Sequence, residues 1–140
     1  VELRKSQFRA IRRRIDRDIS DATLGAAALT AQFFITRPTL YRMFEPYGGI
    51  GKYILGRRLT GVFRDLSEPS LVHEKVATIM RRWGLENHPA AGRAFRAAWG
   101  ITPSECRRRA LHQRQSGEAP KPPAFTIPPE MPANIRAFKD

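Results

Sequence analysis

The sequence predicts an all-α protein with two helix-turn-helix subdomains joined by a long connecting helix, and three observations favour it. Apolar residues recur at helical spacings through residues 1–115, where strand-like alternation is scarce. Glycine, proline and capping residues divide that pattern into short helices. The order of helix, turn, helix and glycine stop occurs twice, as expected for paired helix-turn-helix units.

The first half is expected to hold three helices before a glycine pair. The apolar side of the first helix is formed by Phe8, Ile11, Ile15 and Ile19. Arginines lie between these positions and make the outer face basic. An alanine-rich helix follows over residues 24–33. Thr36 is a suitable N-cap for a third helix, which Gly48–Gly49 would end.

The middle of the chain is expected to be a helix over residues 51–66, ended by a proline-containing break at 67–70. Such a helix would span roughly 24 Å and, with its flanking units, could separate two reading helices by about one DNA turn (~34 Å). The next helix runs from Val72 to Trp83 and stops at Gly84.

Two further helices complete the second half. Asn87 is a good N-cap for a helix with Pro89 in its first turn, and Gly100 would end it. Residues 102–105, Thr-Pro-Ser-Glu, form a capping box for the last helix, which is expected to end near Gln113.

The expected domains are a first unit over 1–50, the connecting helix over 51–66, a second unit over 67–115 and a tail over 116–140. The tail has six prolines in 25 residues and no helical period, so it is predicted to be disordered. The chain does not begin with methionine, so we expect it to be a piece of a longer protein.

The two halves match at a shift of 51 residues. The equivalent pairs are Leu29 and Met80, Thr36 and Asn87, Pro38 and Pro89, Arg42 and Arg93, Phe44 and Phe95, Gly49 and Gly100, and Ile50 and Ile101. An arginine therefore recurs at the same position of the second helix of both units, which indicates a duplicated unit.

The charge of the chain favours a polyanionic partner. The 140 residues carry 25 Lys and Arg against 13 Asp and Glu, a net charge of +12, and residues 1–115 hold the whole excess. A unit this basic is suited to nucleic acid first and to an anionic membrane surface second. No apolar run approaches the ~20 residues of a membrane span, and the charged first residues are unlike a signal peptide.

No enzyme, cofactor or metal site is expected. The histidines (His73, His88 and His112) are scattered, and Cys106 has no second cysteine for a disulfide or zinc site. Gly48–Gly51 lacks the strand before it and the Lys-Ser/Thr after it that phosphate-binding loops require. The single cysteine fits a reducing compartment and is expected to be a small buried thiol.

The exposed sides of the two equivalent helices are the candidate DNA-reading surfaces. An arginine in the major groove can donate two hydrogen bonds to a guanine edge, whereas a solvated or phosphate-binding arginine is the alternative. Candidate base contacts are Pro38, Thr39, Tyr41, Arg42, His88, Pro89 and Arg93.

Other polar residues are candidate phosphate contacts, which add affinity and salt dependence without reading sequence. They are Thr36, Arg37, Lys52, Arg57, Arg58, Arg96, Arg107 and Arg108. The N-terminal ends of both reading helices would also present N–H groups to phosphates.

Several stretches match a known family in order. Residues 29–44 read LTAQFFITRPTLYRMF and residues 53–59 read YILGRRL, while the second half contains RWGL, RAF and GITPSE over 82–85, 93–95 and 100–105. Together they resemble the C-terminal DNA-binding domain of AraC/XylS-family transcription regulators over about residues 8–112. The family's turn glycine is Phe34 here, its capping serine is Gly25, its second-unit Phe and Ser are Ala91 and Gly92, and its late tyrosine is Cys106.

We therefore expect sequence-specific binding of double-stranded DNA for transcription regulation, with helices 37–45 and 88–98 in successive major grooves. The resemblance implies a bacterial cytoplasm, contact with RNA polymerase, mostly as an activator, and a preceding effector or dimerising domain that would form a homodimer. Two alternatives stay open. One is a basic structural RNA-binding protein, and the other is an adaptor that uses the proline-rich tail without binding nucleic acid.

Overall fold

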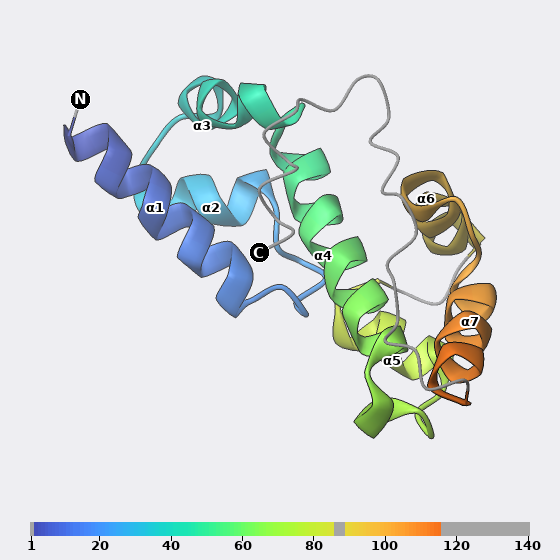
Figure 1. Ribbon diagram of the computed structural model, residues 1–140. Coiled ribbons are helices and arrows are strands. Elements are labelled where there is room, and N and C mark those ends of the chain that lie inside the picture. Colours follow the sequence, from blue (N-terminus) through green and yellow to red (C-terminus); the bar gives the residue numbers. More distant parts are fainter. Residues whose placement is uncertain (1, 86–88, 116–140) are drawn as a thin grey trace. The chain divides into compact units, whose positions relative to one another are not determined.

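The computed structural model describes residues 2–85 and 89–115 (Figure 1). The helices are α1 (Glu2–Arg17), α2 (Ala26–Phe33), α3 (Arg37–Phe44), η1 (Glu45–Tyr47), α4 (Ile50–Ser67), η2 (Pro69–Leu71), α5 (Val76–Arg82), α6 (Pro89–Trp99) and α7 (Pro103–Gln115). These residues contain helices and no strand, which confirms the predicted all-α class. The expectations for Asn87, His88 and the tail over 116–140 lie outside the described residues.

The chain divides into two compact units at Arg57 and Arg58, within α4. The first unit contains α1, α2, α3 and the start of α4, and the second contains the rest of α4 with α5, α6 and α7. The connecting helix expected over 51–66 is therefore not separate from the two units, because the boundary between them lies inside it. One helix supplies the last element of the first unit and the first element of the second.

The first unit packs α2 against both α1 and α3. In Figure 1, α1 runs alongside α2, and α3 is seen almost end-on above them. The fully buried side chains of this unit include Ile11, Ile15, Leu29, Leu40, Phe44 and Tyr53. They come from all four helices, so burial of a shared apolar core holds the unit together.

Aromatic rings fill the end of this core where α3 meets α4. The Phe44 ring lies 5.1 Å from Phe8 and 5.0 Å from Tyr53 between centroids, and Tyr47 of η1 lies 5.1 Å from Tyr53. The buried Tyr53 hydroxyl accepts a hydrogen bond from Arg12 Nε at 3.0 Å. Pairs of this geometry stabilise a core beyond the area that they bury.

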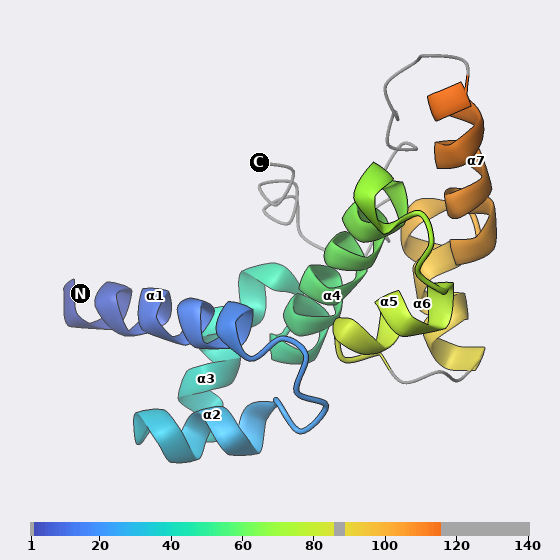
Figure 2. The ribbon, with the colours of Figure 1, turned by 90° about the horizontal axis from the view of Figure 1, so that it is seen from below.

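The second unit packs both α5 and α6 against α7, and Figure 2 shows these three helices gathered beside the end of α4. Its buried apolar side chains include Leu59, Val62, Leu66, Ile79, Met80, Phe95, Ala98, Trp99 and Ile101. The Trp99 ring stacks on Phe63 at 4.4 Å, and its Nε1 donates to the Leu59 carbonyl at 3.3 Å. These contacts attach α6 to α4.

The repeat extends to the helix that opens each unit. At the shift of 51 residues, Ile11 falls on Val62 and Ile15 on Leu66, and all four are buried. Thus the second half of α4 corresponds in the second unit to α1 in the first unit, by its place in the repeat and by its buried residues. The sequence pattern had shown the repeat only from the second helix onward.

Helices α2 and α5 end with the same backbone form. The residue after α2, Phe34, is left-handed (φ 54°), and Ile35 N–H bonds the Thr30 carbonyl at 3.3 Å. After α5, Gly84 is left-handed (φ 78°), and Leu85 N–H bonds the Met80 carbonyl at 3.0 Å. Both are Schellman-type helix ends.

These turns correct the register of the repeat. Phe34 and Gly84 are 50 residues apart, whereas Pro38 and Pro89 are 51 apart. The second turn is therefore one residue longer, and fully buried Leu29 corresponds to fully buried Ile79 rather than to Met80.

Three helix boundaries differ clearly from the prediction. The first helix ends at Arg17, before Ile19, the second begins at Ala26 instead of Leu24, and α5 begins at Val76 instead of Val72. The Val72 carbonyl accepts a hydrogen bond from Arg107 Nη1 at 2.6 Å. That tertiary bond satisfies the carbonyl without a helix, so residues 72–75 turn before α5 starts. In the part of the chain that the structure describes, no helix is long and apolar enough to cross a membrane.

Candidate nucleic-acid interface

Helix α3 is begun by the residue that the sequence predicted. The Thr36 hydroxyl oxygen accepts from Thr39 N–H at 3.3 Å, and Pro38 lies in the first turn. The Thr36 hydroxyl also donates to Thr39 Oγ1 at 3.0 Å. Both threonine hydroxyls are therefore engaged in the cap.

This cap alters the expected phosphate site at the start of α3. Pro38 has no N–H, Thr39 N–H bonds Thr36, and Leu40 N–H bonds the Thr36 carbonyl at 3.1 Å. Of the N–H groups of the first turn, Arg37 to Leu40, only that of Arg37 makes no such bond. The charge of the Arg37 side chain, rather than a set of free N–H groups, would attract a phosphate here.

The exposed side of α3 forms one continuous stripe. Arg37, Pro38, Tyr41, Arg42 and Glu45 are exposed, while Leu40 and Phe44 on the opposite side are completely buried. Tyr41 leaves 47% of its surface exposed. Three of the candidate base contacts, Pro38, Tyr41 and Arg42, thus lie together on the solvent side of a firmly anchored helix. Thr39 is half-buried beside them.

Helix α6 presents a matching stripe. Pro89, Ala90, Arg93, Arg96 and Ala97 are exposed, and the buried side is formed by Ala91, Phe95, Ala98 and Trp99. Among the described residues, no hydrogen bond or ion pair engages the Arg42 or Arg93 side chain. Each guanidinium therefore keeps all its donors for a ligand.

The anchors beneath the two stripes differ. Leu40 and Phe44 hold α3, whereas the equivalent positions in α6 are Ala91 and Phe95. Gly92 adds no side chain, and a Cβ at that position would touch nothing within 4 Å. At the position of Leu40, α6 therefore has a smaller anchor than α3, although Phe95 and Trp99 are also buried on that side.

The remaining phosphate candidates are not equivalent. Arg96 and Arg108 are exposed, and Lys52 and Arg58 are half-buried. Arg57 Nε pairs with Asp16 Oδ1 at 2.9 Å, which links α4 to α1 within the first unit. A phosphate would have to compete with that carboxylate for Arg57.

Arg107, predicted as a phosphate contact, bonds the protein itself in this structure. Its Nη1 donates to the carbonyls of Val72 and Glu74, at 2.6 and 3.0 Å. Its Nε and Nη2 are buried. Because the guanidinium faces the protein, Arg107 joins α7 to the loop before α5.

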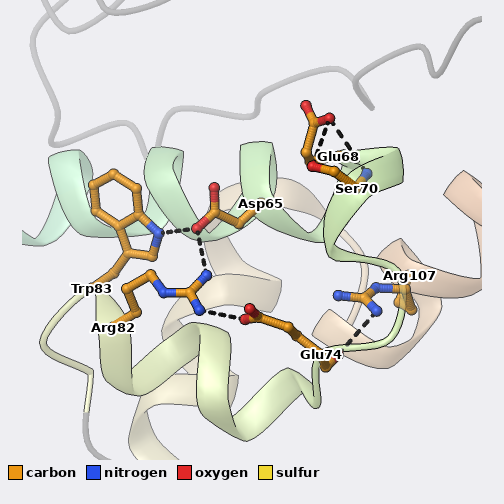
Figure 3. A network of polar contacts seen from close by, with 7 residues as sticks. All are labelled: Asp65, Glu68, Ser70, Glu74, Arg82, Trp83 and Arg107. Atoms are coloured by element: carbon orange, nitrogen blue, oxygen red, sulfur yellow. Dashed lines mark hydrogen bonds and ion pairs between the residues drawn. The ribbon is translucent and has the colours of Figure 1, made fainter.

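Arg107 belongs to a polar network in the second unit (Figure 3). Arg82 forms an ion pair with Glu74, and its Nη1 lies 3.6 Å from Asp65 Oδ2. The same Asp65 oxygen accepts from Trp83 Nε1 at 2.7 Å. The network joins α4 to both ends of α5, and the sequence offered no signal for these pairings.

The described residues show no group of three or more histidines, cysteines or carboxylates that could hold a metal ion. Cys106 is buried, and burial raises the pKa of its thiol to about 11. The thiol is therefore protonated at neutral pH and is a poor nucleophile. Its surroundings match the buried role that the sequence predicted.

Sequence reasoning noted Phe34 only as a departure from a family pattern. The structure gives it a left-handed backbone and leaves 94% of its surface exposed.

No family model matches the chain, and no solved structure matches it either.

Proposed function

We propose that the chain binds double-stranded DNA sequence-specifically, as the DNA-binding part of a transcription regulator. The supporting observation is the pair of exposed stripes on α3 and α6. The helix before each one ends in the same left-handed form, at Phe34 and Gly84. Each stripe carries an exposed arginine, Arg42 or Arg93, at the same position of the repeat, with no partner among the described residues. Helix-turn-helix proteins use the second helix of each unit in this way.

The charge supports duplex DNA as the ligand. The +12 chain would gain affinity from phosphates through the exposed Arg37, Arg96 and Arg108. Arginines on an exposed helical stripe suit the wide major groove of B-form DNA, whereas the deep, narrow groove of an RNA duplex admits no helix. Base reading would then fall to the side chains of α3 and α6.

The wider role follows from the resemblance to AraC/XylS regulators. We propose that the chain acts in the cytoplasm of a bacterium and contacts RNA polymerase, mostly as an activator. A preceding effector-sensing domain would supply dimerisation.

The test is to select bound sequences from random duplex DNA with the full chain. A defined site of two short blocks is expected, since two helices would read separate grooves. An RNA duplex of the same sequence should compete poorly. Recovery of random sequences, or preferential binding to the RNA, would overturn the proposal.

Variants of the two arginines test the reading surface. Arg42→Ala is expected to cost about 1–3 kcal/mol at the selected site and to relax the preference at one base pair. Arg93→Ala should cost less, because Ala91 is a smaller anchor than Leu40 and Gly92 loosens the helix beside Arg93. Arg108→Ala is the control, since an exposed phosphate contact should weaken all sequences alike. An equal loss of specific and non-specific binding in Arg42→Ala would contradict base reading.

The salt dependence of the affinity tests the contacts to DNA phosphates separately from base reading. A protein that neutralises about 6–10 phosphates should lose ~10³–10⁵ in affinity between about 50 and 200 mM salt. Affinity that hardly changes over this range would show that the charge does not act on phosphates.

A further inference from the structure

An apolar groove lies in the first unit beside the turn between α2 and α3. It has a volume of about 610 Å³ and is lined by Leu3, Arg4, Ser6, Gln7, Phe34 and Ile35. Phe34 leaves 94% of its surface in solvent and Leu3 leaves 83%, which makes them the most exposed of the large apolar side chains in the described residues. Two such side chains beside one groove are typical of an interaction surface.

Phe34 also adopts a conformation that disfavours its own residue type. Its φ of 54° is left-handed, and it is the one residue other than glycine with a positive φ among those described. Glycine occupies the corresponding turn position, Gly84, in the second unit. The phenylalanine therefore adds strain at this turn, and its ring gains almost no burial in return.

Polar residues line one side of the groove, and basic residues are near it in the sequence. Gln7 bridges it, since its Oε1 accepts from Arg4 Nη1 at 3.0 Å and its Nε2 donates to the Phe33 carbonyl at 3.5 Å. Arg4 and Lys5 are exposed on α1, and the exposed Arg37 follows Ile35 by two residues. Glu2 is the single carboxylate nearby in the sequence, and it faces Lys5 at 3.9 Å.

We infer that this groove, named here the Phe34 groove, binds an acidic amphipathic segment of a partner protein. An apolar side chain of that segment would enter between Phe34 and Leu3, and a carboxylate would face Arg4, which lines the groove. Charge complementarity selects this occupant, because a second copy of a +12 chain would bring like charges together. A DNA phosphate would gain little from a mainly apolar lining.

This surface is independent of the proposed DNA binding, and its test uses no DNA to detect the partner. Displayed random peptides of about 16 residues would be selected against the full chain at physiological salt. The expected consensus has Leu, Met or an aromatic residue at helical spacing, flanked by Asp or Glu. Enriched peptides should bind Phe34→Gly at least about tenfold more weakly.

Glycine is suited to the left-handed turn, so Phe34→Gly should fold, and its melting curve would verify this. Tyr41→Ser is the matched control, since it removes an exposed aromatic outside the groove and should leave peptide affinity within about twofold. Leu3→Ser should weaken the peptide as Phe34→Gly does.

Several results would overturn the inference. The selection could enrich no peptide, or it could enrich peptides that lack carboxylates. The enriched peptides could also bind the Phe34→Gly variant as tightly as they bind the unchanged chain. A dimer in sedimentation that Phe34→Gly dissociates would identify a second copy as the occupant. If the Phe34→Gly variant lost more than about tenfold in affinity for duplex DNA, Phe34 would belong to the DNA interface instead.

Discussion

The two units build the same turn and helix with different means. In the first, Phe34 adopts the left-handed turn position at a cost, and α3 is held by Leu40 and the aromatic ring of Phe44. In the second, Gly84 adopts that position freely, and a polar network fastens α5. Both units also pack aromatic rings together, Phe44 with Tyr53 in the first and Trp99 with Phe63 in the second. The comparison shows that a repeat can keep its buried pattern while the turn residue and the polar contacts around its helices change.

Among the variants that test this comparison, Gly61→Ala should lower the free energy of unfolding most. A Cβ on Gly61 would overlap the indole ring of Trp83, which lies flat on α4 and bonds Asp65. Because the obstacle is a rigid ring, we expect the free energy of unfolding to fall by about 2–3 kcal/mol. Denaturant titration measures this.

The control is Gly56→Ala in the same helix, where a Cβ meets nothing within 4 Å. That variant should be neutral or more stable by up to ~1 kcal/mol, since alanine favours helix. Equal losses in both variants would show that the Trp83 contact does not restrict position 61.

Arg107→Ala should come next. It removes two charge-assisted hydrogen bonds to the carbonyls of Val72 and Glu74, so we expect a loss of about 2 kcal/mol in the free energy of unfolding. Arg108→Ala, exposed on the same helix, should change stability by less than ~0.5 kcal/mol. If the two variants melted alike, the network would not hold the second unit.

Exchanging the turn residues should have opposite effects in the two units. Phe34→Gly removes left-handed strain and is expected to raise stability by about 0.5–1 kcal/mol. Gly84→Ala imposes that strain and should lower stability by about 1–2 kcal/mol. Thermal melts of both variants check the signs, and a destabilised Phe34→Gly would mean that the ring supports the fold.

Gly92→Ala should have the smallest effect. A methyl group fits there without contact, and alanine in place of glycine inside a helix is worth up to ~1 kcal/mol. A slightly higher melting temperature is expected. If α6 reads DNA, the Arg93→Ala penalty should then grow toward that of Arg42→Ala, and no change in that penalty would contradict the link between helix firmness and reading.

Much of the candidate site could be predicted because its signals are local. Thr36 and Thr102 cap the helices that follow them, and Gly84 and Gly100 take positive φ values where helices were expected to end. The exposed positions of Arg42 and Arg93 follow from the buried period of their own helices. Caps, stops and periodicity involve residues within one or two turns, so sequence alone carries them.

Other features depend on neighbours that sequence does not bring together. Arg107 and Arg108 are both arginines on one basic helix, yet Arg107 bonds carbonyls 33 and 35 residues earlier in the chain while Arg108 is exposed. The late start of α5, at Val76 instead of Val72, is explained by the same bond. A hydrogen-bond partner far along the chain is chosen by packing, not by spacing.

By itself, the sequence determined the helices, their caps, the charge and the duplication, since each depends on local residue preferences. Only the tertiary structure decided that α4 serves both units, that Asp65 bonds Trp83, and that Phe34 stands in solvent beside the groove lined by Leu3. The physical reason is the same in each case. Burial and long-range hydrogen bonding depend on which surfaces meet after the helices have formed, and residues with identical local patterns then acquire different environments.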